Sequence, residues 1–295
     1  MSSPTIDAWR ARGRFIATPD GEVFVVRLGG GDGIPVLVLH GFPTSSWDFA
    51  ACVASLASER PVVLFDFLGF GLSDKPVRYA YSLLEQADVA LAVARAEGIT
   101  RAHVWAHDMG TSVATELVAR RERIGLPFEL VSLTLMNGSV HIELAHLTPG
   151  QKVLRTKAGP LFARLMNATA FRVQMRRLFP RPPSDAELDA MWALLARADG
   201  ALRLPAISGY LTERTRFEGR WIGALTRLDA PTLVAWGRRD PVAVDAIARR
   251  LAEEIPGAHL RWWDELGHYP QVEDPARVAD TVGAFWREVD AGPRR

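Results

Sequence analysis

Short runs of apolar residues recur along the chain, and each ends at a glycine or a polar residue. Several runs are continuous rather than alternating, which is typical of strands that are buried on both faces of a parallel sheet. Near the N-terminus, Asp20-Gly21 lies between two β-rich runs and predicts a hairpin instead. The runs that predict buried strands are 36–39, 62–65, 103–106, 130–136, 233–236 and 259–263.

Helical periodicity separates these strands. The predicted helices are 81–97, 109–123, 244–254 and 275–289. Strands and helices that alternate in this way predict an α/β fold, with a mostly parallel central sheet flanked by helices. The exception is 139–224, where the pattern is helical throughout and prolines divide it into several helices. We therefore expect a core formed by 1–138 and 225–295, with 139–224 inserted as a helical cap.

Composition narrows the class of protein. Hydrophobic residues make up 48% and charged residues 23% of the 295 residues, which excludes global disorder. Lys and Arg total 35 against 34 Asp and Glu, so the formal net charge of +1 gives no electrostatic reason to expect nucleic acid or a charged membrane as a partner. Cys52 is the only cysteine, which excludes an internal disulfide and cysteine-rich metal centres.

The N-terminal residues lack the apolar segment of a signal peptide. No uninterrupted apolar run approaches the roughly 20 residues that a membrane span needs. The sequence therefore predicts a cytoplasmic protein, and it leaves a homodimer open.

Asp108 is the first candidate for chemistry. It follows a predicted strand and precedes a predicted helix, with Ala106 two residues before it and Gly110 two residues after it. This is the spacing of a nucleophile elbow, a sharp turn that lifts one side chain above the edge of the sheet. Aspartate is also a common helix cap, so this feature alone leaves both interpretations open.

Three further stretches each follow a predicted strand. They are His40-Gly41-Phe42-Pro43, the stretch around Asp240 and the stretch around His268. The chain order is thus a nucleophile, an acid and a histidine, which is the order in α/β-hydrolases. Because the carboxyl ends of parallel strands meet at one edge of the sheet, we expect these residues to meet there.

The chain resembles the α/β-hydrolase superfamily, specifically the branch with an aspartate nucleophile that contains epoxide hydrolases and haloalkane dehalogenases. Within that branch it is most similar to the mesoderm-specific transcript group. The resemblance implies that Asp108 is the nucleophile, His268 the general base and Asp240 its orienting acid, with Asp264 a weaker candidate for the acid. The segments that carry the resemblance are 40–49, 65–76, 107–120, 220–231 and 267–275.

An aspartate nucleophile suits attack on a saturated carbon. A carboxylate, with a reference pKa of about 3.9, is ionised at pH 7 and needs no base to activate it. The product of the attack is an ester of Asp108, and His268 would activate water to hydrolyse it. The resemblance implies that the backbone N–H groups of Phe42 and Met109 form the oxyanion hole for this second step.

The expected substrate is a small apolar epoxide, which opens to a vicinal diol without a metal or an organic cofactor. Epoxide hydrolases of this branch donate to the epoxide oxygen from two cap tyrosines, and Tyr210 matches the second of them. No tyrosine stands in place of the first, and His141 or His146 is the candidate substitute. We also expect Trp47 to line the mouth of the pocket.

Other functions remain as alternatives. Haloalkane dehalogenases of this branch have Trp after the nucleophile and Asn or Glu after His-Gly, whereas this chain has Met109 and Phe42, whose side chains donate no strong hydrogen bond. An esterase or lactonase is a further alternative. A non-enzymatic ligand-binding protein is the least favoured, because it would not need Asp108, Asp240 and His268 together.

Overall fold

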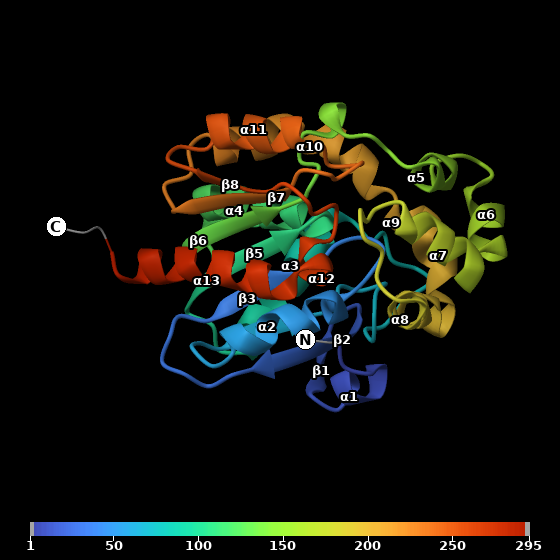
Figure 1. Ribbon diagram of the computed structural model, residues 1–295, viewed down its shortest axis with the longest axis horizontal. Coiled ribbons are helices and arrows are strands. Elements are labelled where there is room, and N and C mark those ends of the chain that lie inside the picture. Colours follow the sequence, from blue (N-terminus) through green and yellow to red (C-terminus); the bar gives the residue numbers. More distant parts are fainter. Residues whose placement is uncertain (1–2, 293–295) are drawn as a thin grey trace.

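The structure, a computed structural model, describes residues 3–292. Its centre is one sheet, which within these residues has the strand order β1-β2-β4-β3-β5-β6-β7-β8 (Figure 1). The pairs β1–β2 and β2–β4 are antiparallel, and the other neighbours are parallel. The strands are β1 (Gly13–Thr18), β2 (Gly21–Leu28), β3 (Val36–Leu39), β4 (Val62–Phe65), β5 (Arg101–His107), β6 (Glu129–Met136), β7 (Thr232–Gly237) and β8 (His259–Trp263).

The apolar runs predicted the strands closely. The runs 36–39, 62–65 and 259–263 coincide with β3, β4 and β8, and the expected hairpin joins β1 to β2. The strands β5, β6 and β7 extend one or two residues beyond the predicted runs. The reason is that strand pairing uses backbone groups, so a polar residue such as Arg101 at the end of an apolar run still joins the ladder.

The helices start at local signals in the sequence. Helices α3, α5 and α8 each begin with a capping box. In it, the side chains of the residue before the helix and of the third helical residue each accept from the other's backbone N–H. The α-helices are α1 (Ile6–Arg10), α2 (Ala50–Leu56), α3 (Leu83–Ala96), α4 (Met109–Ile124), α5 (Pro149–Leu154), α6 (Gly159–Leu165), α7 (Ala168–Arg176), α8 (Asp185–Ala196), α9 (Leu204–Ile207), α10 (Tyr210–Leu225), α11 (Asp245–Glu254), α12 (Pro270–Glu273) and α13 (Pro275–Asp290). Short 3-10 helices occur at η1 (Ser46–Phe49), η2 (Ile142–Leu144) and η3 (Arg197–Arg203).

Helices cover both faces of the sheet. In the view of Figure 1, α2 and α13 lie in front of the sheet, and α3 and α4 lie behind it. The two helices of each pair contact each other. Trp286 of α13 packs on Trp105 and His103 of β5, so the front face of this central strand is fully buried. The core therefore consists of two apolar layers with the parallel strands between them.

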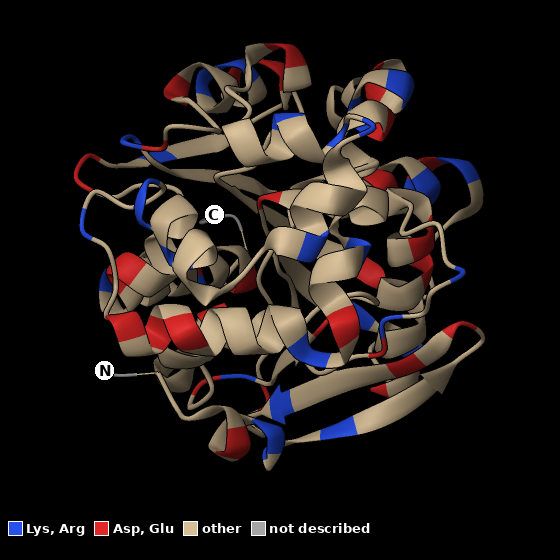
Figure 2. Cartoon of the chain, turned by 90° about the vertical axis from the view of Figure 1, so that its right-hand side faces the viewer, with Lys and Arg blue, Asp and Glu red and all other residues tan. Residues whose placement is uncertain are grey.

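The chain between β6 and β7 forms the second layer of the molecule. All of it lies in helices, turns and loops, from η2 through α10. Helices α5 to α9 gather at the right of Figure 1, beyond the carboxyl ends of the parallel strands. Figure 2 shows this side of the molecule, where basic and acidic residues are interspersed. Of the helices in residues 3–292, none is both long and apolar enough to cross a membrane.

Candidate active site

Asp108 lies in the sharp turn between β5 and α4. Its backbone angles, φ 46° and ψ −111°, fall in a region that residues other than glycine rarely adopt. The turn brings the start of α4 against β3, and a Cβ at Gly110 would lie only 2.3 Å from the carbonyl oxygen of Leu39. Although Asp108 precedes α4, its side chain makes no capping hydrogen bond. The helix-cap interpretation is therefore excluded.

The carboxylate of Asp108 faces the loop that follows β3. The backbone N–H of Phe42 donates to Oδ2 of Asp108 over 2.8 Å. A Cβ at Gly41 would lie 2.7 Å from Cβ of Asp108, so only glycine lets the two segments approach this closely. The N–H of Met109 begins α4 and has no partner inside the helix. Of the two N–H groups that the resemblance assigns to the oxyanion hole, that of Phe42 thus already contacts the carboxylate of Asp108.

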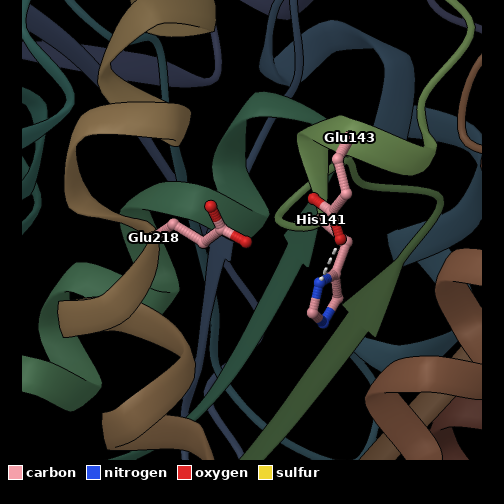
Figure 3. A group of neighbouring side chains, drawn as sticks. All are labelled: His141, Glu143 and Glu218. Atoms are coloured by element: carbon pink, nitrogen blue, oxygen red, sulfur yellow. Dashed lines mark hydrogen bonds and ion pairs between the residues drawn. The ribbon is translucent and has the colours of Figure 1, made fainter.

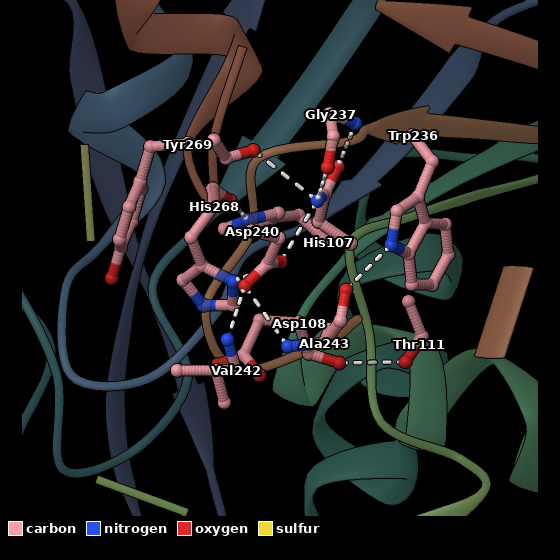
Figure 4. Close-up of polar contacts among 12 residues, drawn as sticks. His107, Asp108, Thr111, Trp236, Gly237, Asp240, Val242, Ala243, His268 and Tyr269 are labelled. Atoms are coloured by element: carbon pink, nitrogen blue, oxygen red, sulfur yellow. Dashed lines mark hydrogen bonds and ion pairs between the residues drawn. The ribbon is translucent and has the colours of Figure 1, made fainter. Parts of the chain in front are cut away.

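His268 and Asp240 form a hydrogen-bonded pair beside Asp108 (Figure 4). Oδ2 of Asp240 lies 2.7 Å from Nδ1 of His268. Because an ionised carboxylate only accepts hydrogen bonds, Nδ1 carries the proton and Nε2 is left as the basic nitrogen. His268 lines the cavity described below, whereas Asp240 does not. The arrangement holds one histidine in the tautomer that a general base requires.

Asp240 is held in place by three further donors. Oδ1 accepts from the backbone N–H groups of Val242 and Ala243, over 2.7 and 2.9 Å. Oδ2 accepts from Nδ2 of Asn137 over 2.8 Å, and that amide also donates to two backbone carbonyls. These bonds satisfy a carboxylate that is 4% exposed, so its charge is stabilised without water. Asn137 was not predicted from the sequence, although this residue directly follows the end of a strand.

Two histidines near the site have opposite pKa shifts. Burial disfavours the charged form of His268, but the charge of Asp240, the hydrogen bond to it and the charges of Asp108 and Glu273 together outweigh burial and raise the pKa of His268. Burial lowers the pKa of His107 to about 4. Neutral His107 donates from Nε2 to the carbonyl of His268 over 2.7 Å and accepts at Nδ1 from Gln271. His107 therefore supports the backbone of His268.

A cavity of about 480 Å³ lies above Asp108 and His268. Its walls come mainly from the helices between β6 and β7 and are largely apolar. The core contributes Phe42, Pro43, Pro241 and Val242 as well as Asp108 and His268. Such a space suits a compact apolar molecule with one reactive centre near the carboxylate. The cap residues that line it include Leu147, Val153, Leu154, Phe162, Phe171 and Met175.

Tyr210 lies next to this cavity but does not line it. The residue is fully buried, and its ring packs against Phe42 with 5.4 Å between ring centroids. Nε2 of Gln151 donates to the hydroxyl of Tyr210 over 2.9 Å, and Gln151 lines the cavity itself. Gln151 was not predicted from the sequence, because it lies 59 residues before Tyr210 and nothing local indicates their contact.

Arg214 is a buried cation beside Asp108 that was not predicted from the sequence. It is 1% exposed, and Nη2 lies 3.7 Å from Oδ1 of Asp108 and donates to the backbone carbonyl of Asp108 over 3.2 Å. Nε donates to Ser112 over 2.9 Å, and the guanidinium lies over the ring of Tyr210. Its place one helical turn after Tyr210 was the available signal, because such residues share a helix face.

Two residues expected at the substrate lie elsewhere. Trp47 is buried, and its indole donates to the carbonyl of Pro4, so it does not line the cavity. The ring nitrogens of His141 contact the carboxylates of Glu143 and Glu254, also away from the cavity. Both residues were assigned from their position in the sequence, which does not show which way a side chain points.

His146, the other candidate substitute, does line the cavity. Asp264 lies on the surface in an ion pair with Arg238, so it is not the partner of His268. Figure 3 shows His141 and Glu143 with Glu218, whose ligand atoms lie within 4.8 Å of one another. Because both nitrogens of His141 already contact carboxylates, we assign no metal to this group.

Comparisons with known proteins place this chain in the α/β-hydrolase family. A family model described as "alpha/beta hydrolase fold" matches residues 34–275. The protein LipZ of Mycobacterium tuberculosis is 45% identical over 285 residues, which cover 96% of this chain and 98% of LipZ. The mesoderm-specific transcript homolog protein of Homo sapiens is 34% identical over 296 residues, which cover 96% of this chain and 88% of that protein. The similarity thus spans the core and the helical segment alike.

The fold is also that of solved structures. The crystal structure of haloalkane dehalogenase DbeA from Bradyrhizobium elkani superposes with a TM-score of 0.81 at 24% sequence identity. The match covers 95% of this chain and 99% of that chain. At this identity the likeness establishes a shared architecture, and the chemistry has to be argued from the site.

Proposed function

This chain is a hydrolase of the α/β-hydrolase family, and we propose that it opens epoxides to vicinal diols through an ester on Asp108. The observation that carries the proposal is a carboxylate at the nucleophile turn. It is 3% exposed, it borders the cavity, and it accepts a hydrogen bond from the N–H of Phe42. A serine at this position would need a base to become a nucleophile, whereas a carboxylate is one already.

In the first step, one carboxylate oxygen of Asp108 attacks a ring carbon of the epoxide. A carbon–oxygen bond forms to Asp108, the ring carbon–oxygen bond breaks, and its electron pair moves to the ring oxygen. That oxygen then needs a proton, and Tyr210 is the proposed source. The apolar cavity favours this step because it excludes water, which would otherwise solvate and weaken the nucleophile.

In the second step, Nε2 of His268 takes a proton from a water molecule, whose oxygen attacks the carboxyl carbon of Asp108. Negative charge then develops on a carboxyl oxygen of Asp108, where the N–H of Phe42 already donates over 2.8 Å. One such donor is worth about 3 kcal/mol in comparable sites. Asp240 stabilises the imidazolium that forms on His268. Collapse of the intermediate releases the diol and restores the carboxylate.

An epoxide is favoured over a haloalkane because of the hydrogen-bond donors near the nucleophile. A departing halide needs donors that stay in place, and the side chains of Met109 and Phe42 supply none. The pair formed by Gln151 and Tyr210 offers an amide and a hydroxyl, which suit a leaving oxygen. We therefore expect styrene oxide to give a diol and brominated alkanes to release no bromide.

The ester is tested by one turnover in ¹⁸O-labelled water with the enzyme in excess over styrene oxide. Water attacks the carboxyl carbon, so the label should enter the side chain of Asp108 while the diol keeps unlabelled oxygen. Mass spectrometry of the digested protein locates the label. In a parallel sample, Asp108→Ala should form no diol. Diol formation without any label at Asp108 would reject the mechanism.

A further inference from the structure

Gln151 lies between the cavity and the only tyrosine of the helical segment. Its side chain lines the cavity and is 8% exposed, whereas Tyr210 behind it is fully buried. The hydrogen bond of 2.9 Å joins Nε2 of Gln151 to the hydroxyl of Tyr210. A substrate in the cavity therefore meets the amide of Gln151 together with, or before, the hydroxyl of Tyr210.

The start of α5 sets the orientation of this amide. The backbone N–H of Thr148 donates to Oε1 of Gln151 over 2.8 Å, and the hydroxyl of Thr148 accepts from the N–H of Gln151. Because a backbone N–H can only donate, the amide oxygen must face Thr148 and the NH₂ group must face Tyr210. The capping box that begins the helix thereby aims two protons towards the site.

Gln151 and Tyr210 each keep one proton that can donate a further hydrogen bond. The NH₂ group of Gln151 has two protons and no available lone pair, so the hydroxyl of Tyr210 accepts in their hydrogen bond. The hydroxyl proton of Tyr210 must then point elsewhere. Within residues 3–292, neither this proton nor the second proton of Gln151 has a hydrogen-bond partner. Two protons are thus available to one acceptor placed near the pair.

We infer that Gln151 is a second hydrogen-bond donor to the leaving oxygen of the epoxide, acting together with Tyr210. This inference rests on the proposed function. In the ring-opening step, Tyr210 gives its proton to the oxygen and becomes a phenolate. Gln151 donates one N–H to the new hydroxyl oxygen and the other to the phenolate. When water hydrolyses the ester of Asp108, the proton that is released returns to Tyr210, so the enzyme is restored.

The environment of Tyr210 explains why a second donor is needed. Burial, and then the charge of Asp108, raise the pKa of Tyr210, which makes loss of its proton costly. Arg214, whose guanidinium lies 4.7 Å from the ring centroid, and the hydrogen bond from Gln151 act in the opposite direction. Gln151 therefore lowers the cost of the phenolate at the stage where the ring opens.

Two variants isolate the amide donor. Gln151→Glu keeps an acceptor for the N–H of Thr148 but removes both N–H donors, and Gln151→Met keeps the side chain neutral but removes them too. The loss of the donor is the change that the two share. As a matched control, Glu187→Met removes the corresponding residue from the capping box of α8, at a position that does not line the cavity.

Rapid-quench mixing with styrene oxide and mass spectrometry of the intact protein measure ester formation and ester hydrolysis separately. Both Gln151 variants should form the ester more than tenfold more slowly than the wild type and hydrolyse it within threefold of the wild-type rate. Glu187→Met should match the wild type in both steps. Adding Tyr210→Phe to Gln151→Met should slow ring opening by less than the product of the single effects, because the two donors serve one oxygen.

The outcomes separate this inference from the proposed function. If the wild type forms an ester on Asp108 and both Gln151 variants form it at the wild-type rate, the inference is wrong and the proposed function stands. Equal slowing of both steps in these variants would mean that Gln151 acts only through the fold of the cap, which also overturns the inference. If the wild type forms no ester, the proposed function fails, and the role of Gln151 fails with it.

Discussion

At the scale of single residues, the site depends on where protons are fixed before any substrate binds. Asp240 accepts from the backbone N–H groups of Val242 and Ala243, from Asn137 and from His268, so it holds the proton of His268 on Nδ1. The other nitrogen is then available as a base towards Asp108. Burial lowers the pKa of His268, but the charge and hydrogen bond of Asp240, together with the charges of Asp108 and Glu273, raise it above its ordinary value.

The first prediction concerns this histidine. In His268→Gln, ring opening should proceed, because the carboxylate of Asp108 needs no base, while ester hydrolysis should slow by at least about a hundredfold through loss of the general base. Mass spectrometry of the intact protein after mixing with styrene oxide should show an ester that persists. The same substitution at the exposed His259 serves as the control and should leave no ester. A His268→Gln protein that turns over without accumulating ester would contradict the assignment.

At the scale of elements, the short helix α12 positions the histidine. Glu273 at its end accepts from the N–H of Gly267 through both carboxylate oxygens, over 2.9 and 3.0 Å, and from the N–H of Tyr269 over 3.3 Å. These two residues flank His268 in the chain. Burial raises the pKa of Glu273 to about 7. The carboxyl group of Glu273, whose pKa is near neutral pH, thus holds the loop that carries His268 in place by hydrogen bonds.

The second prediction is a pH dependence of stability. Because the pKa of Glu273 is about 7 in the folded protein and near 4.5 when unfolded, the folded state holds more protons between these values. The contribution of Glu273 to stability should therefore fall as the pH rises from about 4.5 to about 7. Glu273→Gln removes the titration, so the Tm of the wild type relative to the variant should be higher at pH 5 than at pH 8. A Tm difference that is the same at both pH values would contradict this.

At the scale of the whole molecule, the helical segment is fixed to the core through α10 and α4. Glu116 of α4 is 1% exposed and accepts from Arg120, from Trp221 over 2.9 Å and twice from Arg220, over 3.0 and 2.8 Å. The same α4 begins directly after Asp108, and the same α10 carries Tyr210 and Arg214. This contact therefore sets the distance between Asp108 and the residues proposed to act on the leaving oxygen.

The third prediction tests this attachment. Glu116→Ala leaves a buried indole N–H and two arginines without their acceptor, so the free energy of unfolding should fall by about 3 kcal/mol. Urea denaturation at pH 7 measures the change. The control is Glu122→Ala on the same helix, which removes an exposed ion pair with Arg227 and should have almost no effect. An equal loss of stability in Glu116→Ala and Glu122→Ala would contradict this, because the buried contact would then stabilise the fold no more than an exposed ion pair does.

Much of this architecture could be predicted from the sequence, because its signals are local. Continuous apolar runs mark strands that are buried on both faces, and glycines at Gly41 and Gly110 mark places where two backbones approach closely. The order of Asp108, Asp240 and His268 at successive strand ends then indicated the α/β-hydrolase fold, and the resemblance to the mesoderm-specific transcript group is confirmed. The chemical roles of the site residues stay predictions until they are tested.

The tertiary structure decided which side chains meet. Gln151 lies 59 residues before Tyr210 and is bonded to it, and Asn137 lies 103 residues before Asp240 and is bonded to it. Trp47 and His141, by contrast, point away from the cavity. No local pattern encodes such contacts, because they depend on how separate elements pack. The sequence by itself determined the type of fold and the order of the candidate reacting groups, while packing decided the tautomer of His268 and which hydrogen-bond donors lie at the cavity.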